Sequence, residues 1–218
     1  MLTRARLVVL ALAALALAAC GSIHPGDAAV VDGTAISMKT FDTNARLYCE
    51  LSLRGAAQQG VQSPSVPNEE VRRHAISDLV TVIVARDLAK QKGVTPDVKS
   101  YKRSSAEIKA IAEVFPRGDD AKTVTTILEN DAEISAIAIA LAEQSTGLTL
   151  TDDNQQQLFT TGREMIDKAF KDHDVKLAPR FGLSGTLKDL APTGSVSVSE
   201  VGFDAPTDEE LPPEQRCA

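Results

Sequence analysis

The chain has 218 residues, of which 43% are hydrophobic and 24% charged, and its formal net charge is −7. This composition is typical of a folded protein with room for one domain and its own core. An acidic chain without tryptophan and with only 4% aromatic residues lacks the cationic surface and the stacking rings that bind nucleic acids. We therefore expect no nucleic-acid partner.

The first twenty residues predict export and lipidation. Arg4 and Arg6 precede an apolar run, Leu7–Leu17, which leads through two alanines into Cys20. A positive start, a short apolar run and small residues before a cleavage site are typical of a secretory signal. The run is too short for a transmembrane helix, which needs about 20 apolar residues. The segment resembles the bacterial lipobox, whose cysteine takes a diacylglycerol. The alternative is an ordinary signal peptide in which Cys20 stands by chance.

We expect residues 1–19 to be a signal peptide, residues 20–26 a lipidated tether, and the chain to lie on the extracytoplasmic face of the cell membrane. Removal of the two arginines of the signal changes the net charge to −9, and anionic lipids repel such a surface. The acyl chains on Cys20 would therefore hold the chain at the membrane. We expect no cofactor besides this covalent anchor.

The next segment predicts a hairpin that leads into a helix. Asp32-Gly33 lies between two short apolar runs, Ala28–Val31 and Thr34–Ile36, and this dipeptide is a strong hairpin signal. Ser37 is a good N-cap, and apolar residues at helical spacing predict a helix over Lys39–Arg54.

Periodicity and capping residues predict four further helices after a loop at residues 55–67. They are Asn68–Lys92 with Asn68 as cap, a helix capped by Thr95 that carries Val98 to Ile111, Asp119–Ser145, and a helix capped by Thr151 that ends near Phe170. Alternating residues then predict a strand over Asp174–Ala178. From residue 184 to residue 218 the sequence is acidic and rich in Ser, Gly and Pro, which predicts a flexible tail.

The cysteines allow one disulfide. Lipidation of Cys20 leaves Cys49 and Cys217. In an oxidising compartment two such thiols suggest a bridge, which would pin the tail to the first helix. The alternative is a buried Cys49 and an unbonded Cys217.

The order of these elements resembles the N-terminal chaperone domain of the SurA and PrsA family of extracytoplasmic foldases. The matching segments are Ala28–Ser37 at the start and Val175–Gly182, which contains Pro-Arg-Phe-Gly, at the end. The resemblance covers residues 27–183 and implies a mainly α fold in which the terminal strand pairs with the opening hairpin. Isomerase members insert a parvulin domain before that strand, and this chain has no room for one. The resemblance therefore implies a chaperone domain without prolyl isomerase activity.

No residue pattern predicts catalysis or a metal site. His24, His74 and His173 lack partners at a metal-ligand spacing, so we interpret all three as structural. His173 is expected at the C-terminus of the last helix, where its charge suits the helix dipole. Asp152-Asp153-Asn154 lacks the glycine and the distal glutamate of a calcium loop, and we interpret it as a helix N-terminus.

We thus expect a non-catalytic lipoprotein that binds unfolded or extended segments of exported proteins. The alternative is an accessory or scaffold lipoprotein that binds one folded envelope partner. A broad apolar groove between the helices would favour the first function, because exposed apolar patches mark binding sites. A packed core beneath a polar surface would favour the second.

Overall fold

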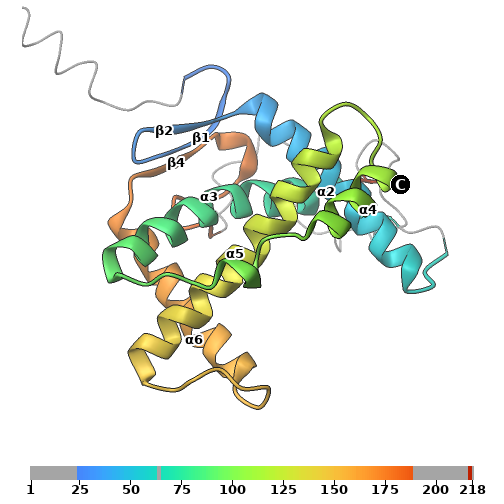
Figure 1. Ribbon diagram of the computed structural model, residues 1–218. Coiled ribbons are helices and arrows are strands. Elements are labelled where there is room, and N and C mark those ends of the chain that lie inside the picture. The colour runs from blue at the N-terminus through green and yellow to red at the C-terminus, as the bar shows by residue number, and fades with distance from the viewer. Residues whose placement is uncertain (1–23, 63–64, 189–215, 218) are drawn as a thin grey trace, which may run out of the picture.

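A small antiparallel sheet joins the two ends of a mainly helical domain, as predicted (Figure 1). The computed structural model describes residues 24–62, 65–188 and 216–217. The predicted signal peptide, Cys20 and most of the predicted tail lie outside these residues. Strands β1 (Asp27–Val31), β2 (Thr34–Ser37) and β4 (Val175–Leu177) have the order β2-β1-β4. The predicted pairing of the terminal strand with the opening hairpin is therefore confirmed.

The hairpin turn has the backbone that its sequence predicts. Asp32 and Gly33 both adopt positive φ angles, 48° and 81°, as a two-residue turn between twisted strands requires. The Asp32 carboxylate also accepts the backbone N–H of Asp174 at 2.8 Å and lies 2.5 Å from Nδ1 of His173. The turn is thereby tied to the strand that closes the sheet.

His173 contacts residues far from the helix that it follows. It follows a short 3-10 helix, η2 (Phe170–Asp172), and its side chain is only 4% exposed. Its Nε2 lies 3.8 Å from the Asp87 carboxylate, so the imidazole bridges two acids. His173 does follow the last helix, as predicted, because η2 directly continues α6 (Gln155–Ala169) and His173 is its C-cap. Its ring contacts acids of the hairpin turn and of α3 (Asn68–Lys92), which the sequence did not predict.

The first two long helices are the predicted ones, with shifted ends. Helix α2 (Met38–Gln58) starts at the predicted cap, where the Ser37 hydroxyl accepts the N–H of Thr40 at 3.1 Å, and it runs four residues past Arg54. Helix α3 begins at Asn68 itself, so Asn68 is not its cap. A short strand, β3 (Val66–Pro67), runs directly into this helix, and the extended Pro67 takes the cap position without a side-chain bond.

The third predicted helix was wrong in its start. Only a 3-10 turn, η1 (Val98–Ser100), follows Thr95, and α4 (Ser105–Val114) starts at Ser104. The Ser104 side chain accepts the Glu107 N–H, and the Glu107 carboxylate accepts the Ser104 N–H at 2.8 Å. This capping box satisfies two backbone donors and sets the boundary.

Helix α5 (Asp120–Thr146) matches its predicted length, whereas α6 starts later than expected and is shorter. The Asn154 side chain accepts the N–H of Thr151 at 2.8 Å and donates to the carbonyl of Thr149 at 2.9 Å. This turn displaces the helix start to Gln155. Thr151 is thus not the cap, and Asp152 and Asp153 precede the helix.

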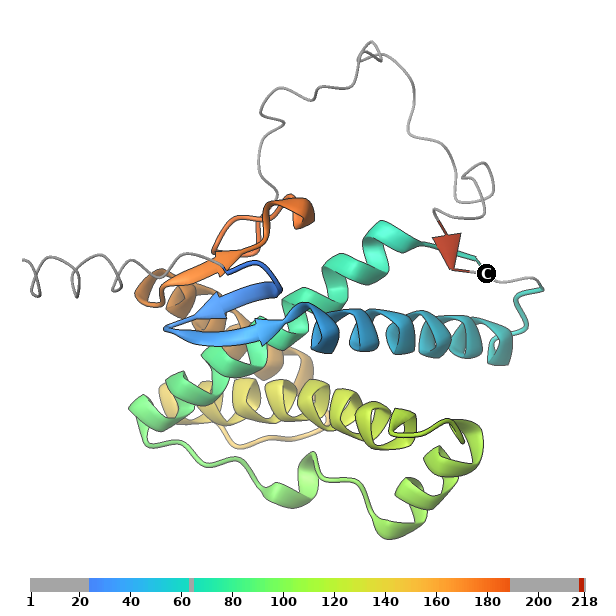
Figure 2. The same cartoon turned by 90° about the horizontal axis from the view of Figure 1, so that it is seen from above.

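A second sheet lies at the far end of α2, away from the point where the described chain begins (Figure 2). Strand β5 (Arg216–Cys217) pairs with β3, so that Val66 opposes Cys217. The predicted loop at residues 55–67 therefore ends in a strand. Cys217 is 5% exposed, and its sulfur is paired with that of Cys49 on α2, with 5.8 Å between the Cα atoms.

The core is continuous beneath the sheet and between the long helices. Helix α3 packs against α2, α5, α6 and β1. Fully buried side chains from these elements include Phe41, Ile76, Ile137 and Ile166. A smaller cluster of Leu47, Phe115, Val124 and Ile127 lies where α2 meets α5, and α4 itself buries no residue completely.

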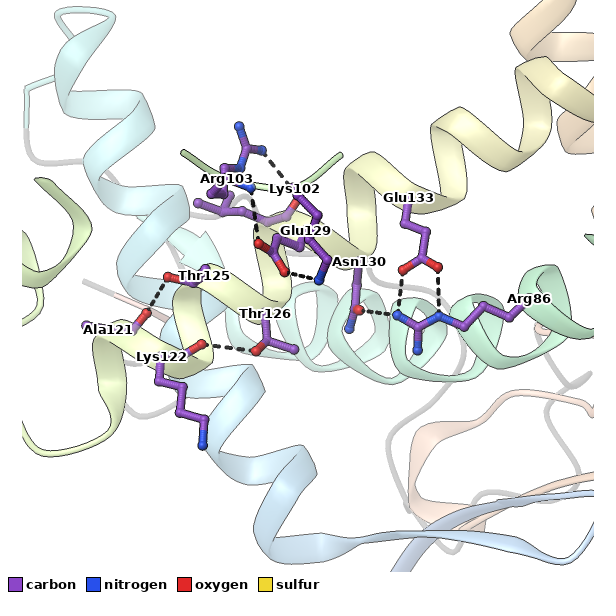
Figure 3. Close-up of polar contacts among 11 residues, drawn as sticks. Arg86, Lys102, Arg103, Ala121, Lys122, Thr125, Thr126, Glu129, Asn130 and Glu133 are labelled. Carbon is purple, nitrogen blue, oxygen red and sulfur yellow. Dashed lines mark hydrogen bonds and ion pairs between the residues drawn. The ribbon is translucent and has the colours of Figure 1, made fainter. Parts of the chain in front are cut away.

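Polar contacts fasten α5 to α3 and to the η1 loop (Figure 3). Arg86 on α3 donates to Glu133 through Nε at 3.0 Å and to Asn130 at 2.9 Å. Glu129 accepts the ammonium of Lys102 at 2.6 Å and the N–H of Arg103 at 3.1 Å. Because these groups satisfy one another, we interpret them as structural. Within the described segments, no helix is both long and apolar enough to cross a membrane.

Candidate functional site

The side of α3 that faces α6 is hollowed. A cavity of about 640 Å³ lies between α3, α6 and the segment that follows β4. Its size falls in the range of ligand pockets, about 300–1,000 Å³. Its lining residues are His74, Ser77, Asp78, Thr81, Arg163, Glu164, Asp167, Lys168, Phe170, Lys171, Thr186, Leu187 and Lys188. Most of these side chains are polar or charged, although their apolar atoms contribute somewhat more of the exposed lining than their polar atoms do. The lining is therefore mixed and is not the broad apolar groove that would favour a general chaperone.

Asp78 is the least expected residue of the cavity. Its side chain is 19% exposed, yet it lies on a helix whose neighbouring positions are packed in the core. The Tyr48 hydroxyl on α2 donates to its Oδ2, and His74 Nε2 lies 3.3 Å from the same oxygen. The Tyr48 and His74 rings meet edge to face, with centroids 5.0 Å apart. These three residues form a polar cluster that joins α2 to α3 at the cavity wall.

Burial controls the ionisation of this cluster. Loss of water raises the pKa of Asp78 above its ordinary value, an effect that the Tyr48 hydrogen bond and the nearby charges of His74 and Arg163 only partly oppose. The Asp131 carboxylate raises it further. Burial, followed by the charge of Asp78, likewise raises the pKa of Tyr48. Tyr48 therefore stays a hydrogen-bond donor at physiological pH.

Two polar atoms of the wall are left without a partner among the described residues. Thr81 is only 3% exposed and lines the cavity, but its hydroxyl makes no hydrogen bond to them. The second oxygen of Asp78, Oδ1, has none either. Neither atom is among the fully buried polar atoms that lack a partner in the described residues, so both are open to a donor from solvent or from a ligand in the cavity.

The rim of the cavity carries charges of both signs. On α6, Arg163 lies 4.0 Å from Asp167, and Lys168 lies 3.8 Å from Glu164. These pairs are exposed and contribute little stability.

A shallower hollow of about 460 Å³ continues the cavity along α3 towards Pro67. The two hollows share His74, Ser77 and Leu187. Glu69, Glu70 and Arg73 line its outer part. We call the two hollows together the α3 groove, and its length and openness suit an extended ligand more than a small enclosed one.

The structure places the sequence-predicted residues in separate regions. His24 is exposed before the hairpin, where its backbone N–H donates to the Asp27 carboxylate. His173 lies between the hairpin and α3, and Cys49 and Cys217 lie together at the second sheet. Of the three histidines and of Cys49 and Cys217, all of which lie in the described part of the chain, only His74 lines the α3 groove. In the described part of the chain no three His, Cys, Asp or Glu side chains group in a way that could hold a metal ion.

Sequence reasoning missed Tyr48, Asp78, Thr81 and Arg163. One signal was available, because Asp78 falls between Ile76 and Leu79 in an otherwise apolar helical run. A charged residue at such a position is expensive to bury and is therefore informative. The partners come from α2 and α6, and nothing in the sequence pairs those helices with Asp78.

Comparison with known proteins yields no relative. No protein family model matches the chain, and neither a curated protein nor a solved structure does so.

Proposed function

We propose that this chain is an extracytoplasmic, lipid-anchored accessory protein that binds a polypeptide partner in the α3 groove and catalyses no reaction. The observation that carries the proposal is the groove itself. It is open, extends along α3 over two connected hollows, and is lined mainly by charged and hydroxyl-bearing side chains. Such a surface suits an extended polypeptide whose polar side chains are recognised individually.

The charged and hydroxyl-bearing side chains that interrupt the apolar lining favour a particular partner over general capture of unfolded chains. A general chaperone needs apolar surface, because that is what unfolded chains have in common. The core side chains that could supply such a surface are packed beneath the sheet and the helices. We therefore place the accessory function ahead of the general chaperone function that the family resemblance implies.

Anchoring rests on the sequence before the hairpin. Cys20 precedes Asp27 by seven residues, and a fully extended tether of that length spans about 25 Å. The domain would then remain next to the membrane, where exported chains emerge. With a net charge of −9 after cleavage, the protein would depend on its acyl chains for this position.

A general chaperone is the second candidate, and two observations favour it. The pairing of β4 with the opening hairpin is the arrangement that the SurA and PrsA resemblance implies. In addition, large apolar side chains are exposed at Ile108 and Val114 on α4, at 43% and 44%. Val61, Val98, Leu148 and Leu150 are exposed as well, but these side chains are spread over several segments and line neither hollow of the α3 groove.

Filling the groove tests the proposal. Ser77 lines both hollows, so Ser77→Trp in the full lipidated chain should block the groove. Gln157→Trp adds the same ring at an exposed site on α6 outside the groove. We expect one partner to crosslink at 1:1 stoichiometry to the wild type and to Gln157→Trp in native membranes, and to be lost with Ser77→Trp. Equal suppression of aggregation of unrelated unfolded proteins by all three would instead support the general chaperone.

A further inference from the structure

We propose that the cavity at Asp78 receives one basic side chain, lysine or arginine, from the polypeptide bound in the α3 groove. This inference rests on the proposed function and names the residue type that the groove recognises. It is carried by the arrangement of acceptors at the cavity wall and by the charges at its rim.

The wall presents acceptors that lack a donor. Asp78 uses Oδ2 for Tyr48 and His74, whereas Oδ1 has no partner among the described residues. The hydroxyl of Thr81, one helical turn further along α3, is equally unpaired there, and Ser77 lines the same wall. An ammonium or guanidinium group carries several donors and no acceptor, so it can satisfy all three side chains at once.

Charge favours the same occupant. A carboxylate that is largely removed from water is stabilised by a cation that binds next to it. His74 lies 3.3 Å from Oδ2 but carries a charge only when it is protonated. Arg163 also acts on Asp78, but it forms no ion pair with Asp78 within 4.0 Å and lies 4.0 Å from Asp167 instead. The charge of Asp131 adds to that of Asp78. When His74 is neutral, the deep part of the cavity therefore lacks a close positive charge.

The remaining walls suit the stem of a long side chain. Phe170 is buried and Leu187 is half-buried, and both line the cavity. Lysine and arginine pack their methylene groups along apolar surface while their charged ends reach a polar site. The cavity, at about 640 Å³, has room for such a side chain together with part of the backbone that carries it.

The rim restricts the residues next to the inserted one. Arg163 and Lys168 have acidic neighbours on α6, but Lys171 and Lys188 make no ion pair among the described residues. They repel a second basic residue and attract an acidic one. The preferred segment thus has a single lysine or arginine flanked by acidic or neutral residues, not a basic run.

Capped peptides with an uncharged dye test this specificity against the full chain in nanodiscs. The probes are one acidic-flanked hexapeptide with a central lysine and its norleucine, glutamate and trilysine versions. At pH 7.5 we expect the single-lysine peptide to bind at least tenfold tighter than the norleucine peptide by fluorescence anisotropy. Equal binding of these two, tighter binding of the glutamate or trilysine peptide, or no binding of any peptide at millimolar concentration would overturn the inference.

Substitutions in the chain test whether the side chains of the cavity cause the lysine preference. Asp78→Asn keeps the shape and removes the charge, so the tenfold lysine preference should disappear. Asp153→Asn changes an exposed carboxylate outside the cavity and should leave it intact. Because Asp78→Asn also alters the contact with Tyr48, Thr81→Val provides a second variant and should weaken lysine binding severalfold. A full lysine preference in both cavity variants, with native melting curves, would contradict the assignment.

The outcome is separable from that of the proposed function. If the 1:1 partner is captured and lost with Ser77→Trp while the peptides show no lysine preference, the groove binds a partner but not through a basic side chain. If the peptides show the preference and no partner is captured, the cavity is specific for basic side chains but the accessory function fails.

Discussion

Gly162 on α6 faces the backbone of Ala138 on α5 so closely that a methyl group at Gly162 would lie 1.8 Å from the Ala138 carbonyl oxygen. The two helices can meet at this distance only because residue 162 has no side chain. We predict that Gly162→Ala lowers the free energy of unfolding by about 3 kcal/mol, because the helices must separate. Urea unfolding followed by circular dichroism measures this change.

Gly55 on α2 supplies the matched control for that substitution. It is also helical, but a methyl group there meets no atom within 4 Å. Gly55→Ala should therefore stabilise the protein, by about 1 kcal/mol, through helix propensity alone. A similar effect of both substitutions would show that α5 and α6 do not meet as described.

The contributions of Asp78 and Asp32 to the free energy of unfolding should depend on pH in opposite directions. Burial raises the pKa of Asp78, so its contribution is fully present below the ordinary value of 3.8 and is lost as the pH rises through the raised value. The His173 hydrogen bond is the main cause that lowers the pKa of Asp32, so its contribution is present above 3.8 and is lost as the pH falls through the lowered value.

The measurement compares the unfolding free energy of the wild type with Asp78→Asn and with Asp32→Asn. We expect the wild type to gain stability relative to Asp78→Asn as the pH falls towards 4. The wild type should lose stability relative to Asp32→Asn as the pH falls below 3.8. The comparison is fair because asparagine also suits the positive φ angle at this site. Carboxyl carbon shifts give the two titrations directly. If both stability differences changed in the same direction with pH, the burial of Asp78 would be contradicted.

We predict that the exported protein carries a Cys49–Cys217 disulfide. Their positions are 168 residues apart, so the bond closes a long loop and should stabilise the fold by about 2–5 kcal/mol. Mass spectrometry should show a gain of about 2 Da on reduction, and Cys49→Ser, Cys217→Ser and the double variant should lose the same stability. Two free thiols in the secreted protein would contradict the pairing.

If Cys20 carries the lipid anchor, Cys20→Ala should abolish both lipidation and membrane attachment. The wild type should incorporate a labelled fatty acid and sediment with membranes, whereas Cys20→Ala should incorporate none and remain in the soluble fraction. Cys49→Ser is the control and should still be labelled. Label retained by Cys20→Ala would contradict lipidation at this residue.

The sequence was most informative where the signal is local. The Asp32-Gly33 turn, the Ser37 cap and the positive-φ glycine after α3, Gly93, all follow from neighbouring residues. The start of α4 was also readable, because Ser104 and Glu107 form a capping box. Thr95 and Pro96 gave a competing signal, but Asp97 caps the short turn η1 instead.

The α3 groove could not be predicted in the same way. It depends on where α6 and the segment after β4 come to lie against α3, and residues from 74 to 188 line its deeper part. Likewise, β3 has only two residues and pairs with a partner about 150 positions later in the chain. Neither the period nor the length of such a strand distinguishes it from a loop.

The sheet order implies a sequence of events in folding. Val31 on β1 pairs with Val175 on β4, and these residues are 144 positions apart. Contacts of such long range form slowly, because the intervening chain must first be brought together. In a chain that emerges from its amino end, the hairpin waits with the β4 side of β1 unpaired until nearly all of the domain has been delivered. Truncation before Val175 should therefore leave a partly folded, protease-sensitive intermediate with that edge open to other strands.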